Sequence, residues 1–125
     1  MKSGVKLIAD TPGAGAAVER GRTYLVRLKM WLNKGESIRW ERPWGMVDRA
    51  RLEDDGATLV SDLRVDRESM VNGLFYGVDG MHVGGTRKLR ISPHLAYGER
   101  GVPGTVPKDA VLVMEIEFIE ERVFR

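Results

Sequence analysis

The chain has 125 residues, a length that predicts one domain, residues 1–125, with a core of its own. It contains no cysteine, which excludes disulfides and thiol chemistry. Its 20 Lys and Arg residues are interleaved with 18 Asp and Glu residues. No basic stripe results, so we expect no nucleic-acid partner.

The N-terminal segment has no apolar run long enough for a signal peptide or a membrane span. We therefore expect a cytoplasmic monomer with no membrane partner.

The first motif, PGAGAAV from Pro12 to Val18, imitates a dinucleotide-binding glycine loop. Such a loop needs a following helix of several turns, because the N-terminal amides of that helix hold the pyrophosphate. Only residues 16–22 precede the strand expected at Thr23, so we interpret the motif as a plain turn and expect no cofactor.

A strand is predicted from Thr23 to Leu32, where apolar residues alternate with Arg27 and Lys29. A hairpin is predicted from Arg49 to Val65, because the pair Asp55–Gly56 tolerates positive φ and its arms alternate in polarity.

One helix is predicted in the segment from 66 to 81, where apolar residues recur at helical spacing. Asp66 is the expected cap, with Glu68 in the first turn. Gly73 and Gly77 weaken a helix by about 1 kcal/mol each relative to Ala, and they suggest close packing on a curved sheet. The helical pattern comprises Met70, Val71, Leu74, Phe75, Val78 and Met81.

Two further strands are predicted, from Arg87 to Ile91 and from Val111 to Ile119. Each strand has one polar face, as in an antiparallel sheet covered on one side. The predicted fold is therefore α+β: a curved antiparallel sheet of five or six strands wrapped around one short helix.

The loop between these strands, ISPHLAYGERGVPGTVP, contains three glycines and three prolines around Tyr97. Ser92 as a cap and Pro93 at the first helical position predict one helical turn that fixes Tyr97. The loop is either the rim of a cavity to which Tyr97 offers its phenol, or a rigid connection in which Tyr97 is a packed core residue.

Metal and covalent chemistry find no support in the sequence. His82 and His94 are the only histidines, and neither has a cysteine or a spaced carboxylate cluster beside it, so we expect no metal site. No serine lies in a nucleophile elbow. Glu115 and Glu117 share the polar face of a strand, where charges usually serve solubility.

The stretch GMHVGGTRKLRISPHLAYGERGVPGTVPKDAVLVMEIEFIE, from Gly80 to Glu120, resembles the C-terminal half of an FKBP-type peptidyl-prolyl cis–trans isomerase. The resemblance extends more loosely to residues 5–38 and to the helix segment SMVNGLFYGVDGM. It implies the same curved sheet around a short helix. It also implies isomerisation of X-Pro bonds in an apolar cup, with proline-containing segments as partners, a role in protein folding, and no cofactor.

Carried over by position, the resemblance implies that Tyr97 supplies a hydroxyl and Val106 a backbone N–H to substrate carbonyls. The residues that would bind substrate are Leu74 as the floor of the cup, with Leu28, Ile38, Arg39, Val71, Thr105 and Met114 around it.

The chain departs from the family at this cup. Leu74 stands where the family has tryptophan, and Leu28, Ile38 and Met114 replace aromatic residues. Arg39 stands where the family has an aspartate. At about 0.5–1.5 kcal/mol for each lost aromatic contact, we expect weaker substrate binding and reduced activity.

An insertion hairpin of about residues 40–62 distinguishes the chain from compact family members, and it carries Trp40 and Trp44. These tryptophans either extend or cover the cup, or, as we favour, pack under the added hairpin.

Two functions follow from the sequence. One is a prolyl isomerase of reduced activity. The other is a non-catalytic module that holds proline-containing segments, and it predicts a cup filled by Arg39 and an aromatic residue of the insertion.

Overall fold

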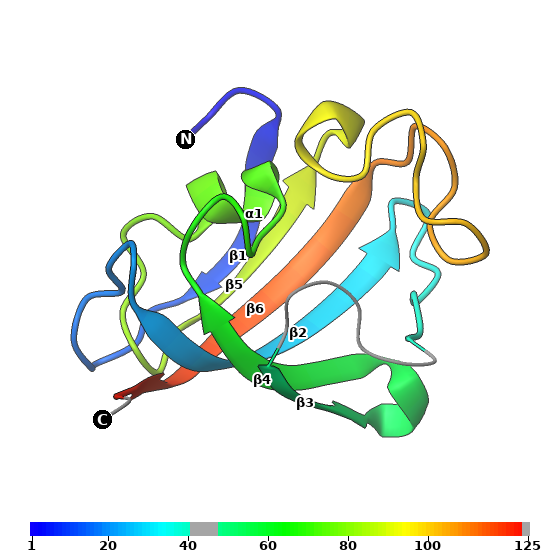
Figure 1. Ribbon diagram of the computed structural model, residues 1–125. Coiled ribbons are helices and arrows are strands. Elements are labelled where there is room, and N and C mark those ends of the chain that lie inside the picture. Colours follow the sequence, from blue (N-terminus) through cyan, green and yellow to red (C-terminus); the bar gives the residue numbers. More distant parts are fainter. Residues whose placement is uncertain (41–47, 124–125) are drawn as a thin grey trace.

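The computed structural model describes residues 1–40 and 48–123, and its strands form a single six-stranded sheet. The strand order is β1-β5-β6-β2-β4-β3, and all neighbours are antiparallel (Figure 1). The strands are β1 (Val5–Thr11), β2 (Thr23–Leu32), β3 (Asp48–Glu53), β4 (Thr58–Arg64), β5 (Thr86–Ile91) and β6 (Leu112–Arg122). The predicted α+β fold with five or six strands is confirmed.

Strand β2 has the bounds that its alternating pattern predicts, and it pairs with β4 on one side and β6 on the other. Its apolar residues Val26, Leu28 and Met30 are buried on the concave face of the sheet. On the outer face, Arg27 donates to the Glu117 carboxylate at 2.6 Å. The alternation therefore reflects a sheet with one apolar face and one charged face.

The predicted hairpin is formed by β3 and β4, which are joined by the short helix η1 (Asp54–Gly56). Asp54, Asp55 and Gly56 all have positive φ, which explains why this turn uses aspartate and glycine. Trp44, which we expected to pack under the hairpin, lies outside the described residues.

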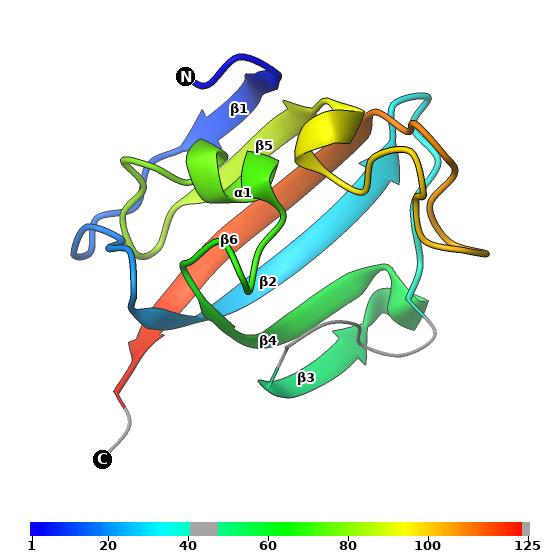
Figure 2. The same ribbon diagram turned by 45° about the horizontal axis from the view of Figure 1, so that its top comes forward.

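Helix α1 (Asn72–Gly77) is shorter than the segment from 66 to 81. The Asp66 carboxylate accepts hydrogen bonds from the backbone N–H groups of Glu68 and Ser69, and so caps a separate turn before the helix. The expected cap was wrong because an aspartate stabilises an isolated turn in the same way as a helix start. Figure 2 shows α1 lying over the concave face of the sheet.

The two glycines of α1 allow the helix to approach the sheet closely, as the sequence suggested. A Cβ on Gly73 would lie 2.3 Å from Ile91 Cγ2, and one on Gly77 would lie 2.4 Å from Leu89 Cδ1. Ile91 and Leu89 are fully buried strand residues. The glycines therefore cost helix propensity but permit a contact that no larger residue allows without displacing the sheet.

The segment PGAGAAV is a turn packed on the chain from 82 to 85, in agreement with its interpretation from the sequence. A Cβ on Gly13 would lie 2.3 Å from the Gly85 backbone nitrogen. The Gly15 N–H donates to the Val83 carbonyl at 2.9 Å. These glycines serve a backbone-to-backbone contact, and no helix follows them before β2.

We predict that Gly73→Ala lowers the free energy of unfolding by about 1–2 kcal/mol, although alanine favours helix, because the new methyl group overpacks against Ile91. Chemical denaturation measures the change. Asn72→Ala is the matched control in the same helix and should be neutral or slightly stabilising. A Gly73→Ala protein as stable as wild type would contradict the close approach.

Candidate functional site

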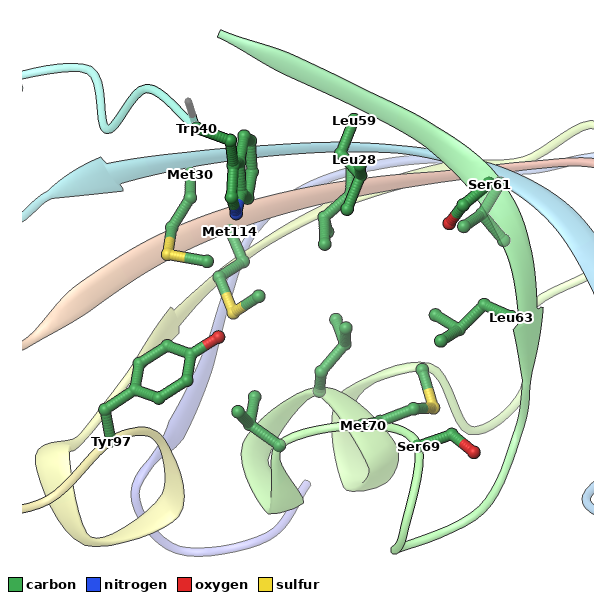
Figure 3. Close-up of a pocket in the computed structure, with 13 residues that line it drawn as sticks. Leu28, Met30, Trp40, Leu59, Ser61, Leu63, Ser69, Met70, Tyr97 and Met114 are labelled. Atoms are coloured by element: carbon green, nitrogen blue, oxygen red, sulfur yellow. The ribbon is translucent and has the colours of Figure 1, made fainter. Parts of the chain in front are cut away.

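A cup opens between the sheet and the start of helix α1 (Figure 3). Its empty volume is about 510 Å³, including the part open to solvent. Apolar side chains dominate the wall, so the interior favours apolar groups over water. The lining residues are Val26, Leu28, Met30, Trp40, Leu59, Ser61, Leu63, Ser69, Met70, Val71, Leu74, Tyr97 and Met114.

Tyr97 lies at the rim of the cup because the short helix η2 (Pro93–Leu95) directs the chain back toward the sheet. The Pro93 carbonyl accepts hydrogen bonds from the N–H groups of Ala96 at 3.0 Å and Gly98 at 2.8 Å. The single helical turn predicted from Pro93 is present, although Ser92 makes no side-chain cap. Figure 3 shows the Tyr97 hydroxyl pointing into the cup.

Burial raises the pKa of the Tyr97 phenol to about 12, because desolvation disfavours the phenolate. The group therefore keeps its proton at neutral pH and is able to donate a hydrogen bond inside the cup.

The rest of the loop forms a tight hairpin beside Tyr97. The N–H and C=O groups of Val102 and Val106 are hydrogen-bonded to each other, with Val106 N donating at 2.8 Å and Val102 N at 2.9 Å. The N–H of Thr105 also donates to the Val102 carbonyl. A Cβ on Gly101 would lie 2.2 Å from the Val106 oxygen, so this hairpin requires glycine there.

This hairpin corrects the role expected for Val106. Its N–H already has a partner, and neither Val106 nor Thr105 is among the residues that line the cup. The error arose because the sequence shows which residues surround a loop tyrosine but not which loop amides pair with one another.

Val71, unlike Val106, combines a place in the wall of the cup with a backbone N–H that is not used in a turn. It lines the cup directly before α1, and its N–H makes no hydrogen bond within the described part of the chain. Its carbonyl accepts the first helical bond, from Phe75 N at 3.0 Å. The N–H groups in the first turn of a helix have no intrahelical partner, and the same holds for this flanking residue.

Four of the predicted substrate-binding residues line the cup together with Tyr97, the predicted hydroxyl donor: Leu28, Val71, Leu74 and Met114. Ile38 is buried in the core next to β2, where its N–H donates to the Met30 carbonyl at 2.9 Å. It is not among the residues that line the cup.

Arg39 does not enter the cup. Its side chain is 55% exposed and lies 3.5 Å from the Asp55 carboxylate. The guanidinium also donates to the backbone carbonyls of Asp55 at 2.9 Å and Asp54 at 3.3 Å. The charge finds partners on the hairpin turn, so the expected position beside substrate is corrected, and Arg39 does not fill the cup.

Trp40 is a lining residue that we expected to find under the hairpin. Its backbone does contact the hairpin turn, because its N–H donates to the Gly56 carbonyl at 2.8 Å. Its indole, however, is 3% exposed and lines the cup (Figure 3). No periodic pattern marks this position, since Trp40 lies in the connection after β2 and belongs to no helix or strand.

Other lining residues that we did not name could have been predicted from the sequence. Val26 and Met30 share the apolar face of β2 with Leu28, so the period-two pattern already places them together. Ser61 is 1% exposed and interrupts an otherwise apolar wall on β4. Figure 3 shows its hydroxyl on the cup side of the strand.

Within the described residues no group of three or more His, Asp or Glu side chains is arranged to hold a metal ion. None of the helices described there is long and apolar enough to cross a membrane.

Comparison with known proteins places this geometry in a family. The family model described as FKBP-type peptidyl-prolyl cis-trans isomerase matches residues 49–119. The peptidyl-prolyl cis-trans isomerase FPR2 of Saccharomyces cerevisiae is 46% identical over 65 residues, which cover 52% of this chain and 47% of that protein. FK506-binding protein 4 of Aspergillus oryzae is 31% identical over 117 residues, 94% of this chain and 22% of that protein. The chain thus spans about half or less of the length of these two relatives.

Solved structures agree with the sequence comparison. AtFKBP13 superposes with a TM-score of 0.71 at 25% identity, covering 96% of this chain and 94% of that one. FkpA from Escherichia coli superposes with a TM-score of 0.65 at 26% identity, covering 97% of this chain and 53% of that one. The chain therefore belongs to the FKBP-type peptidyl-prolyl cis-trans isomerase family.

Proposed function

We propose that this domain catalyses cis–trans isomerisation of X-Pro peptide bonds and does so without covalent chemistry. One observation carries the proposal: an apolar cup holds a phenol and a free backbone N–H at its edge, from Tyr97 and Val71. The family membership supports the same reaction.

The reaction requires little chemistry from the protein. The barrier of about 18–20 kcal/mol reflects the amide resonance lost when the C–N bond twists. X-Pro bonds exchange in tens to hundreds of seconds without help. A twisted amide has less charge separation than a planar one, so a site that excludes water favours the twisted form.

The described residues have separate roles in this proposal. Leu74, Met114 and Leu28 surround the prolyl ring and remove water from its amide. Tyr97 and Val71 donate hydrogen bonds to substrate carbonyls, which keeps the bound peptide in register while the amide twists.

We expect the activity to be reduced. The floor of the cup is Leu74, and the walls carry the thioethers of Met30, Met70 and Met114. Thioether and aliphatic walls hold a prolyl ring by dispersion alone and adapt their shape, whereas aromatic faces add about 0.5–1.5 kcal/mol each.

The second candidate is a module that binds proline-containing segments without isomerising them. The aliphatic floor favours it, whereas the position of Arg39 does not, because Arg39 leaves the cup unfilled. A role in protein folding, the monomeric state, the cytoplasmic location and the absence of a nucleic-acid partner stay predictions from the sequence.

Exchange NMR on a short X-Pro peptide tests the proposal. Wild-type protein should accelerate exchange, and Tyr97→Phe should reduce the acceleration about three- to tenfold, the effect of losing one neutral hydrogen bond. Val71→Pro should give a similar loss, because the Val71 φ of −61° suits proline and the substitution removes the N–H. Val71→Ala retains the N–H and is the control for the loss of the valine side chain. Peptide resonances that shift without any acceleration would establish the binding module instead.

The pH dependence follows from the Tyr97 pKa of about 12. Since the raised pKa keeps the phenol protonated, we predict catalysis that changes little from about pH 7 to about pH 10. The stability that the protonated phenol contributes is complete below about pH 10 and is lost as pH rises toward about 12. Rates measured across this range on folded protein check the prediction, and a fall in activity with a midpoint below pH 10 would contradict it.

A further inference from the structure

The aromatic surface of the cup comes from an unexpected part of the chain. Among the described residues that line the cup, Trp40 and Tyr97 are the only aromatic ones. Tyr97 presents its hydroxyl to the interior, as Figure 3 shows. Of these two described residues, Trp40 is the one left to offer an aromatic face to the substrate.

Prolyl rings bind to aromatic faces in protein recognition, because the rigid ring buries apolar surface against them at little entropic cost. Trp40 lines the cup together with Met30 and Met114. In Figure 3 its indole nitrogen lies on the edge that is turned toward Tyr97. A prolyl ring held between Leu74 and Met114 would also contact this indole.

The backbone of Trp40 is fixed by the hairpin turn and not by a strand. Its N–H donates to the Gly56 carbonyl at 2.8 Å. A Cβ on Gly56, whose φ is +84°, would lie 2.5 Å from the Trp40 carbonyl oxygen. The turn therefore needs glycine at this position to approach the segment that carries the indole.

Arg39 reinforces the same contact from the adjacent residue. Its guanidinium donates to the carbonyls of Asp54 and Asp55 and lies within ion-pair distance of the Asp55 carboxylate. These contacts tie residues 39 and 40 to the turn at 54–56.

We propose that Trp40 is a substrate-binding residue whose indole takes one face of the prolyl ring, and that Arg39 is a positioning residue that holds the indole in the cup through the turn at 54–56. The inference rests on the proposed function and assigns a specificity element of the same site. It makes the added hairpin part of the substrate site, because the hairpin turn orients the indole.

Variant kinetics provide the first test. Trp40→Leu should raise KM for an X-Pro peptide about three- to tenfold with a smaller change in kcat, and Trp40→Phe should retain most of the affinity. Trp31→Leu is the matched control, because Trp31 lies on the outer face, where Lys88 Nζ is 4.5 Å from its ring. An unchanged KM in a folded Trp40→Leu protein would overturn the assignment.

The role of Arg39 is tested by comparing the KM values of single and double variants. Arg39→Ala should raise KM in the same direction as Trp40→Leu but add little to it in the double variant, since both act through the indole. Arg39→Lys should recover part of the affinity, because an ammonium group also donates to the turn carbonyls. Additive effects of the two single substitutions would show that Arg39 does not act through Trp40.

Fluorescence tests the contact without altering Trp40. The chain has three tryptophans, so Trp31→Phe with Trp44→Phe leaves Trp40 as the sole indole emitter. Titration with the X-Pro peptide should change its emission in parallel with the NMR shifts of the Val71 and Tyr97 amides, which report occupancy of the cup.

The amide shifts, the Trp40 emission and the rate of exchange together test the Trp40 contact and the isomerase activity separately. Amide shifts with unchanged emission would overturn the Trp40 contact and leave the isomerase proposal standing. Both signals without acceleration of exchange would support the Trp40 contact and reject catalysis. Neither signal at millimolar peptide would reject both.

Discussion

The close contact between helix α1 and the sheet is the constraint on which the rest of the structure depends. Gly73 and Gly77 bring the helix onto Ile91 and Leu89, so α1 packs mainly against β1 and β5. A helix of six residues covers only part of a curved six-stranded sheet. The concave face over β2 and β4 is therefore left for the cup, which Leu74 of the same helix also lines.

The site places very few polar groups in an apolar interior, and the backbone controls where they lie. Tyr97 is set by the helical turn at Pro93, and Val71 by the start of α1. A peptide carbonyl that enters this interior loses its hydrogen bonds to water, and a hydrogen bond from one of these groups would offset that cost. The apolar interior suits a prolyl ring, and the donors at its edge suit the carbonyl groups of a peptide.

Much of the fold could be predicted from the sequence because period-two alternation records a one-sided sheet, and the bounds of β2 follow from it alone. The length of the helix was overestimated, because Asp66 caps a separate turn before α1. In the sequence, an aspartate that caps a turn cannot be told from one that caps a helix. The lining of the cup was predicted where it lies on regular elements, as for Leu28 and Met114. Val106 was given the wrong role and Trp40 the less suitable of two positions, because both depend on contacts between loops, which no periodicity records.

The most direct test of this account is the position of a bound prolyl ring. Intermolecular NOEs between an X-Pro peptide and protein labelled at its Leu, Ile, Val and Met methyl groups would locate it. The account predicts NOEs from the prolyl ring to the methyl groups of Leu74 and Met114. NOEs confined to exposed residues at the sheet edge, such as Leu7 and Ile8, would show that proline binds elsewhere and would contradict the account.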